Sequence, residues 1–139
     1  MIENVVSDKI AKETIESWLN HKNVHPRKRE MKDTRVNIEV ITYAICDGDL
    51  ILDDDFNLVQ NLRNPVMDKE GKVVLNELSF KPRLLMGDVE NSLMNVKSDN
   101  SIGMLAAYTS ALTGVNSGLV RKIDTDDNKV AQAIVMFFL

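Results

Sequence analysis

The stretch 64-NPVMDKEGKVVLNELSFKPRLL-85 gives the strongest indication of the fold, because it reads as a strand end, a turn and a second strand. Its polar turn "DKEG" ends in Gly71, which tolerates the positive φ that tight turns require. Pro65 lacks an amide donor and therefore fits a strand end or an edge strand. Apolar and polar residues alternate over 56–66 and again over 72–80. The pattern predicts an antiparallel β-hairpin formed by these two segments.

Three to four helices are predicted after the hairpin. Pro82 fits the first turn of a helix, where its missing amide donor is tolerated. Gly114 fits the end of a second helix, a short helical turn is expected at 116–123, and the last helix begins near Asp126. The positions expected to face inward are Leu85 or Met86, Val89, Leu93 and Val96 in the first helix, Ile102, Leu105, Ala106, Thr109 and Leu112 in the second, and Val130, Ala133, Ile134 and Phe137 in the last.

Residues 7–22 predict an amphipathic helix with Ser7 or Asp8 as its N-cap. The polar residues 21–35 follow, and Pro26 interrupts helical geometry there, so a linker or long loop is expected. The apolar positions of the first helix are Ile10, Ala11, Ile15, Trp18 and Leu19.

Residues 36–45 are rich in β-branched side chains and predict a strand. Ile41, Ala44 and Ile45 would also fit the spacing of a helix. An Asp-Gly pair in 46–57 predicts a turn, and the apolar run after it could close a first hairpin. The whole order predicts an α+β fold: an N-terminal helix, a small antiparallel hairpin sheet, then three to four C-terminal helices.

Composition limits the classes of protein to consider. The chain has 139 residues, 44% of them hydrophobic, which suits one domain with a core. Within it, residues 1–55 hold the N-terminal helix, basic linker and strand segment, and 56–139 hold the hairpin and helical part. The net charge of −4 argues against nucleic acid as a partner. No targeting segment or apolar window of about 18 residues is apparent, so no membrane partner is expected.

No residue set predicts catalysis, a metal site or a cofactor. The acidic run 47–55 lacks the glycine and glutamate of a calcium loop, so a turn and a solvated loop are expected. His21 and His25 are four residues apart, but Pro26 and the absence of a nearby glutamate favour surface histidines. Cys46, the single cysteine, has no evident catalytic partner and is expected to be a buried, inert thiol in a reducing compartment. We therefore expect a non-enzymatic protein.

A basic cluster lies in the expected linker. It could meet an acidic partner or nucleic acid, although a solvated linker is the preferred interpretation. The cluster consists of Arg27, Lys28, Arg29 and Lys32.

From about Leu58 to Leu139 the sequence shows a pattern of a hairpin, a polar helix, an "L…TG" element and a final "L…D…V…F" element. The residues of this pattern are Leu62, Pro65, Val66, Gly71, Leu78, Phe80, Lys81, Pro82, Asp88, Leu112, Thr113, Gly114, Ile123, Asp127, Val130 and Phe137. In these residues the sequence resembles the small tail assembly chaperones of contractile-tailed, Mu-like phages. Lys81 is followed directly by Pro82, where the family pattern has one residue between, and residues 1–55 have no counterpart in the shorter members.

The resemblance implies a protein that covers the tape measure protein in the host cytoplasm until tail tube subunits assemble around it. An unpartnered amphipathic helix aggregates, so its chaperone must offer apolar, adaptable residues. Methionines suit that task, although filling the core is the more frequent role for any one of Met67, Met86, Met94, Met104 and Met136. The expected partner-binding residues are Met86, Val89, Leu93, Leu105, Leu112, Phe137 and Phe138.

Two further expectations concern assembly. The alternative to a transient chaperone is a permanent tail, baseplate or connector subunit, which would be found in the virion. A homo-oligomer is also expected, because a coat on a long helix needs many copies. Ile15, Trp18 and Leu19 are the expected oligomerisation residues, since a four-turn helix is marginal in water unless its apolar stripe is covered. Docking of that stripe within its own chain is the alternative.

Overall fold

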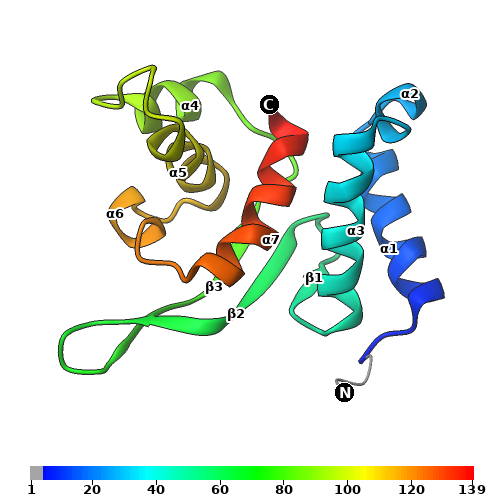
Figure 1. Ribbon diagram of the computed structural model, residues 1–139, viewed down its shortest axis with the longest axis horizontal. Helices are drawn as coiled ribbons and strands as arrows, with labels where there is room; N and C mark the ends of the chain where they lie inside the picture. The colour runs from blue at the N-terminus through cyan, green and yellow to red at the C-terminus, as the bar shows by residue number, and fades with distance from the viewer. Residues whose placement is uncertain (1–4) are drawn as a thin grey trace.

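The computed structural model describes residues 5–139 and confirms the α+β fold, with helices before and after a small antiparallel sheet (Figure 1). The strand order is β1-β2-β3, so β1 and β3 are the edge strands. The elements are α1 (Asp8–His21), α2 (Pro26–Arg29), α3 (Lys32–Cys46), β1 (Leu50–Leu52), β2 (Leu58–Met67), β3 (Val73–Phe80), α4 (Met86–Leu93), α5 (Ser101–Thr113), α6 (Ser117–Val120), α7 (Thr125–Val135) and the 3-10 turn η1 (Met136–Phe138).

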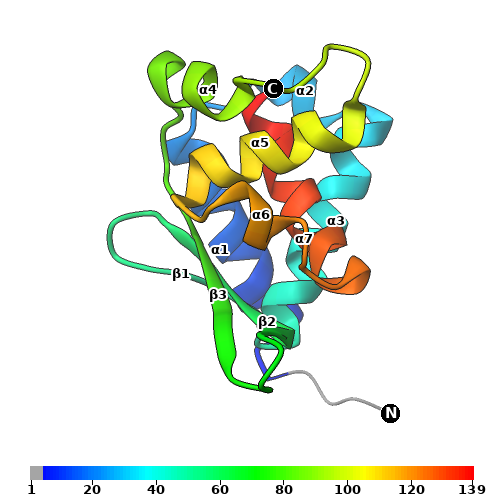
Figure 2. The same cartoon turned by 90° about the vertical axis from the view of Figure 1, so that its left-hand side faces the viewer.

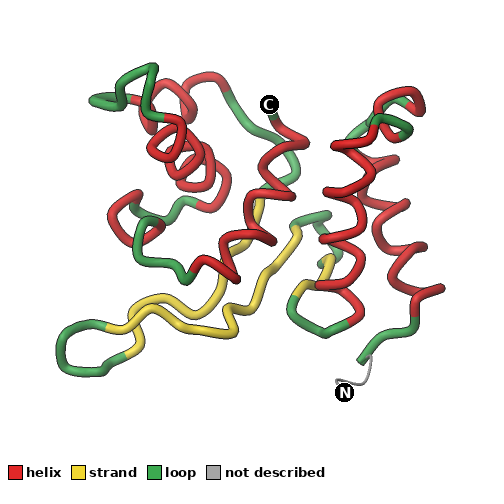
Figure 3. Tube along the Cα trace, viewed as in Figure 1, coloured by secondary structure: helices red, strands yellow, loops and turns green. Residues whose placement is uncertain are grey.

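The predicted hairpin is confirmed as β2 and β3. The two strands are antiparallel, with Leu58 opposite Phe80 at the base and Met67 opposite Val73 near the turn. Gly71 has φ of 80° in that turn, in the left-handed region that glycine tolerates best. Figure 3 shows the turn end of the hairpin projecting away from the helices.

The strand expected at 36–45 is wrong, because these residues belong to helix α3. Ile41 and Ile45 are buried on one side of it, at the helical spacing that the sequence left open. β-branched residues have a modest intrinsic preference against helix, which tertiary packing overrides. Here α3 packs between α1 and α7, and this burial outweighs the local preference.

The linker expected at 21–35 is also wrong, since a tight turn and the short helix α2 connect α1 to α3. Arg29 fixes this connection. Its Nε donates to the Val24 carbonyl at 3.0 Å, Nη1 to the Glu16 carboxylate at 2.9 Å, and Nη2 to the Asn20 side chain at 2.9 Å. His25 caps α2 by accepting the Arg27 amide.

The stripe of α1 docks within its own chain. Ile15, Trp18 and Leu19 are all buried, and the Trp18 ring meets Phe137 edge-on, with centroids 5.3 Å apart. These side chains are therefore not available to a second copy. The preferred expectation, that they form contacts between copies, is corrected to the alternative of docking within the chain. The reason is that α3 and the C-terminal turn already cover the stripe. Ile10, expected inward, is instead exposed.

The C-terminal helices form as predicted, apart from the start of the first. Residues 81–85 make an irregular connection, and α4 begins only at Met86. Pro82 does not start a helix because the chain is held in place here: the Lys81 amide donates to the Leu112 carbonyl at 3.1 Å, and Leu84 packs against the core. Gly114 ends α5 with φ of 73°, as expected.

Candidate interaction surfaces

Several strongly exposed apolar side chains lie in and beside helix α4. We name residues 85–102 the α4 segment. Leu85 and Met86 start it with exposed fractions of 65% and 84%, and Met94 and Ile102 end it with 65% and 76%. Helix α4 has no buried residue, and its main packing contact is with α5. An element that leaves so much apolar surface in water is a candidate for binding a partner.

Most of the methionines are exposed. Core filling was the preferred role for each of the five in the matching region, and this is wrong for four of them, because only Met104 is half-buried. Flexible thioether side chains at the surface suit a binding face that must adapt to varied partners. The exposed methionines of the described residues are Met31, Met67, Met86, Met94 and Met136.

The structure separates the predicted partner-binding residues into three groups. Leu112 and Phe137 are buried, as their inward stripes predict, since Leu112 lies under β3 and Phe137 packs on Trp18, so only the partner contact also expected of them is corrected. Met86 alone is strongly exposed. The others are half-buried, and of these Leu105 and Phe138 pack against the core: Val89, Leu93, Leu105 and Phe138.

Sequence reasoning missed two exposed residues in this surface. Ile102 is expected on an inward stripe and Leu85 is one of two alternatives for such a position, but both face solvent. Ala106, Ala107 and Ala111 are buried in α5, so apolar residues occupy nearly all its sides. Periodicity does not select the buried face of such a helix.

The second exposed region is the turn end of the hairpin, which we name the hairpin arm (residues 65–75). Met67, Val73 and Val74 are exposed there, and both faces of β3 meet solvent in this part. Such a two-stranded ribbon has little stability by itself. A partner that covers it would gain both apolar area and the free edge of β3.

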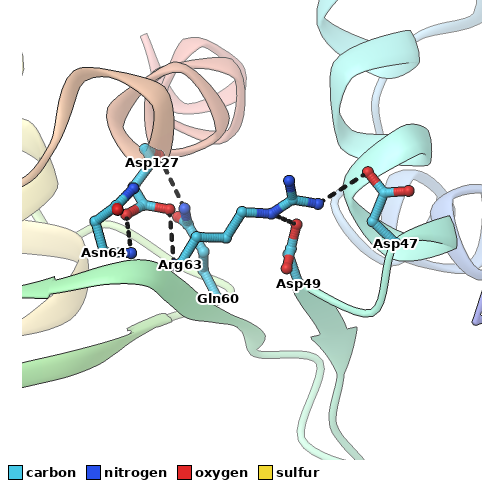
Figure 4. Close-up of polar contacts among 6 residues, drawn as sticks. All are labelled: Asp47, Asp49, Gln60, Arg63, Asn64 and Asp127. Atoms are coloured by element: carbon cyan, nitrogen blue, oxygen red, sulfur yellow. Dashed lines mark hydrogen bonds and ion pairs between the residues drawn. The ribbon is translucent and has the colours of Figure 1, made fainter. Parts of the chain in front are cut away.

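A polar cluster joins β2 to the start of α7 (Figure 4). The register of β2 shifts between Asn61 and Val66, so amides there lose their partners on β3. The buried carboxylate of Asp127 accepts two of these amides, from Arg63 and Asn64, each at 3.0 Å. Asp127 therefore holds the irregular part of β2 against α7.

Two further residues extend the cluster. The Gln60 side chain donates to the Asp127 backbone carbonyl at 2.8 Å, and the Arg63 guanidinium reaches Asp49 at 2.6 Å and Asp47 at 3.3 Å. Among the residues that the structure describes, Gln60 Oε1 is buried without a hydrogen-bond partner. The residue Gln60 is among those that line an open pocket of about 260 Å³ between α3, β2 and α7. The cluster ties β2 to the start of α7 and to the turn between α3 and β1.

The residues considered for chemistry have structural surroundings. The Cys46 thiol is buried and lies 3.3 Å from the Asp8 carboxylate, and both burial and this hydrogen bond raise its pKa, which suppresses the reactive thiolate. His21 stacks on Phe56 with centroids 3.9 Å apart. In the acidic loop, hydrogen bonds from Asn57 hold the pKa of Asp53 below its ordinary value.

The described residues, 5–139, contain neither a cluster of metal ligands nor a helix that could span a membrane. No group of three or more His, Cys, Asp or Glu residues is placed to hold a metal ion in this part of the chain. None of its helices has the length and apolarity to cross a membrane. Comparisons with protein-family models, curated proteins and solved structures found no match.

Proposed function

We propose that this chain is a non-enzymatic phage tail assembly chaperone that binds the tape measure protein in the host cytoplasm. The resemblance of residues 58–139 to that family motivates the proposal. The observation that carries it is the exposure of the α4 segment, which lies in the resembling part. Tape measure proteins are long helical proteins with apolar stripes, and a transient cover for such a stripe needs exposed apolar residues.

The methionines favour a transient cover over a fixed interface. Met86 and Met94 stand at the two ends of α4, and both are exposed. Their unbranched side chains adopt several shapes at little cost, so one surface can follow successive turns of a long helix. An obligate interface, in contrast, is usually packed like a protein core.

A permanent virion component is the second candidate, and the hairpin arm favours it. An arm that projects beyond the core and exposes Met67, Val73 and Val74 suits lasting contacts between neighbouring subunits. Mass spectrometry of purified virions separates the two candidates. A chaperone is expected to be absent from the virion, whereas a subunit is expected in stoichiometric amounts.

Co-expression with the tape measure protein of the same phage tests the chaperone. We expect the wild-type chain to raise the soluble yield of the tape measure protein severalfold. The double variant Met86→Gln/Ile102→Gln should lose most of this gain, because it removes two of the most exposed apolar side chains of the α4 segment.

A matched control uses the other side of the molecule. Ile10→Gln/Val36→Gln makes the same chemical change at exposed positions on α1 and α3, and should retain the gain. All four substitutions are at the surface and should change the free energy of unfolding by only about 0.5 kcal/mol each. If the wild-type chain gives no gain in soluble tape measure protein, the chaperone proposal fails.

A further inference from the structure

A lysine lies on an aromatic ring at one end of the molecule. Lys22, the residue that caps the C-terminus of α1, has its Nζ 3.4 Å from the centroid of the Phe138 ring. Phe138 is half-buried and also touches Trp18, with centroids 6.2 Å apart. The lysine is therefore positioned by the core, while its charge remains at the surface.

Two further cations, from separate elements, lie near enough to Lys22 to act on it electrostatically. Lys28 comes from α2, and Arg83 comes from the connection between β3 and α4. Burial and, to a smaller extent, the positive charges of Arg83 and Lys28 together lower the pKa of Lys22 to about 8. None of the three makes an ion pair with a carboxylate of residues 5–139. The three cations therefore have no carboxylate counter-ion among the described residues.

Exposed apolar side chains adjoin these cations. Leu85 and Met86 follow Arg83 by two and three residues, and both are among the most exposed apolar residues of the chain. Figures 1 and 2 both place α2, the start of α4 and the C-terminal turn at the same end of the molecule. This end, which we name the basic end, combines Lys22, Lys28 and Arg83 with Leu85 and Met86.

We infer that the basic end binds an amphipathic helix with an acidic flank, its apolar stripe on Leu85 and Met86 and its carboxylates on the three cations. The inference rests on the proposed function and specifies which helical segments of the client are bound. Charge complementarity carries it, because unpaired cations next to exposed apolar groups match a helix that presents both features.

Nucleic acid fits this surface less well. The chain carries a net charge of −4, and Arg29, one of the four residues in the basic cluster, is used in bonds to α1 and Val24. Leu85 and Met86 would gain nothing from a phosphate backbone. An acidic amphipathic helix would contact both the cations and the apolar side chains of the basic end.

The test measures binding of labelled synthetic peptides to the purified full-length chain by fluorescence anisotropy. Two peptides carry the same leucine stripe, flanked by glutamate in one and by lysine in the other. We expect the glutamate peptide to bind at least tenfold more tightly at low salt, and the difference to shrink as salt increases. Equal affinities for the two peptides would overturn the inference.

Paired variants locate the site. Lys28→Glu/Arg83→Glu should weaken the glutamate peptide about tenfold, whereas Lys69→Glu/Lys72→Glu makes the same charge change at exposed positions in the hairpin arm and should not. Leu85→Ser/Met86→Ser should also weaken binding of the glutamate peptide, because it removes the side chains that contact the peptide's apolar stripe. Emission from Trp18, the single tryptophan, reports that each variant is folded. Equal binding by both charge variants would also overturn the inference.

Two comparisons separate this inference from its alternatives. A DNA oligonucleotide that binds more tightly than the glutamate peptide, and is unaffected by Leu85→Ser/Met86→Ser, would replace the helix with nucleic acid. If Lys28→Glu/Arg83→Glu still solubilises the tape measure protein as well as the wild-type chain does, the inference fails while the chaperone proposal stands.

Discussion

The α1 face and the α4 segment are both apolar, but they differ in what covers them. Trp18 on α1 is 1% exposed, because α3 and the C-terminal turn pack around it. Met86 on α4 is 84% exposed, and the helix contributes no buried residue. The same kind of amphipathic pattern therefore serves the chain's own core in one region and remains open in the other. The open region is where a partner can gain apolar contact.

The largest expected effect is a loss of stability caused by a substitution in the covered core. Leu78→Asp places a charge at a fully buried position of β3. We expect a loss of about 3 to 5 kcal/mol in the free energy of unfolding. Met86→Asp makes a similar change on the open side and should cost about 0.5 kcal/mol or less. Urea denaturation followed by circular dichroism measures both, and similar costs would show that α4 is not an open surface.

The next effect concerns the polar cluster between β2 and α7. Asp127→Ala removes the acceptor of the Arg63 and Asn64 amides and leaves both unpaired in a part-buried site. We expect a cost of about 2 kcal/mol, since a buried amide without a partner is unfavourable. Asp126→Ala is the matched control, because its ion pair with Lys129 is exposed at both ends. A cost for Asp127→Ala no larger than the control would show that the bulge of β2 does not depend on this carboxylate.

The sequence predicts the hairpin because its signals are local. Gly71 and the alternation on either side of the turn specify the strands without reference to the rest of the chain. Helix α3 was missed because its β-branched residues favour a strand locally, and only packing against α1 and α7 selects the helix. Leu112 and Phe137 are buried as their inward stripes predict, and this burial leaves no surface for the partner contact also expected of them, because the sequence pattern does not say which neighbour covers a stripe. The role of Asp127 depends on contact with Arg63, 64 residues earlier in the chain.

The smallest expected effect is the pH dependence of stability that Lys22 contributes at the basic end, where the covered and open regions meet. Lys22 has its pKa lowered to about 8 in the folded chain, mainly by burial, against an ordinary value of 10.5. Below pH 8 it is charged in both the folded and unfolded states, and burial disfavours the charge in the folded state. Between about pH 8 and 10.5 the unfolded state binds more protons than the folded state, so this contribution to stability increases with pH.

The measurement is the difference in free energy of unfolding between the wild-type chain and Lys22→Gln, taken from pH 7 to pH 10. Glutamine does not titrate, so groups common to both chains cancel. We expect the wild-type chain to gain stability relative to Lys22→Gln as the pH rises through 8. The Phe138 ring acts in the opposite direction, because it stabilises the ammonium form. A relative loss of stability over this range would therefore mean that the ring outweighs burial and keeps Lys22 charged, and would strengthen its role as a cation for an acidic partner.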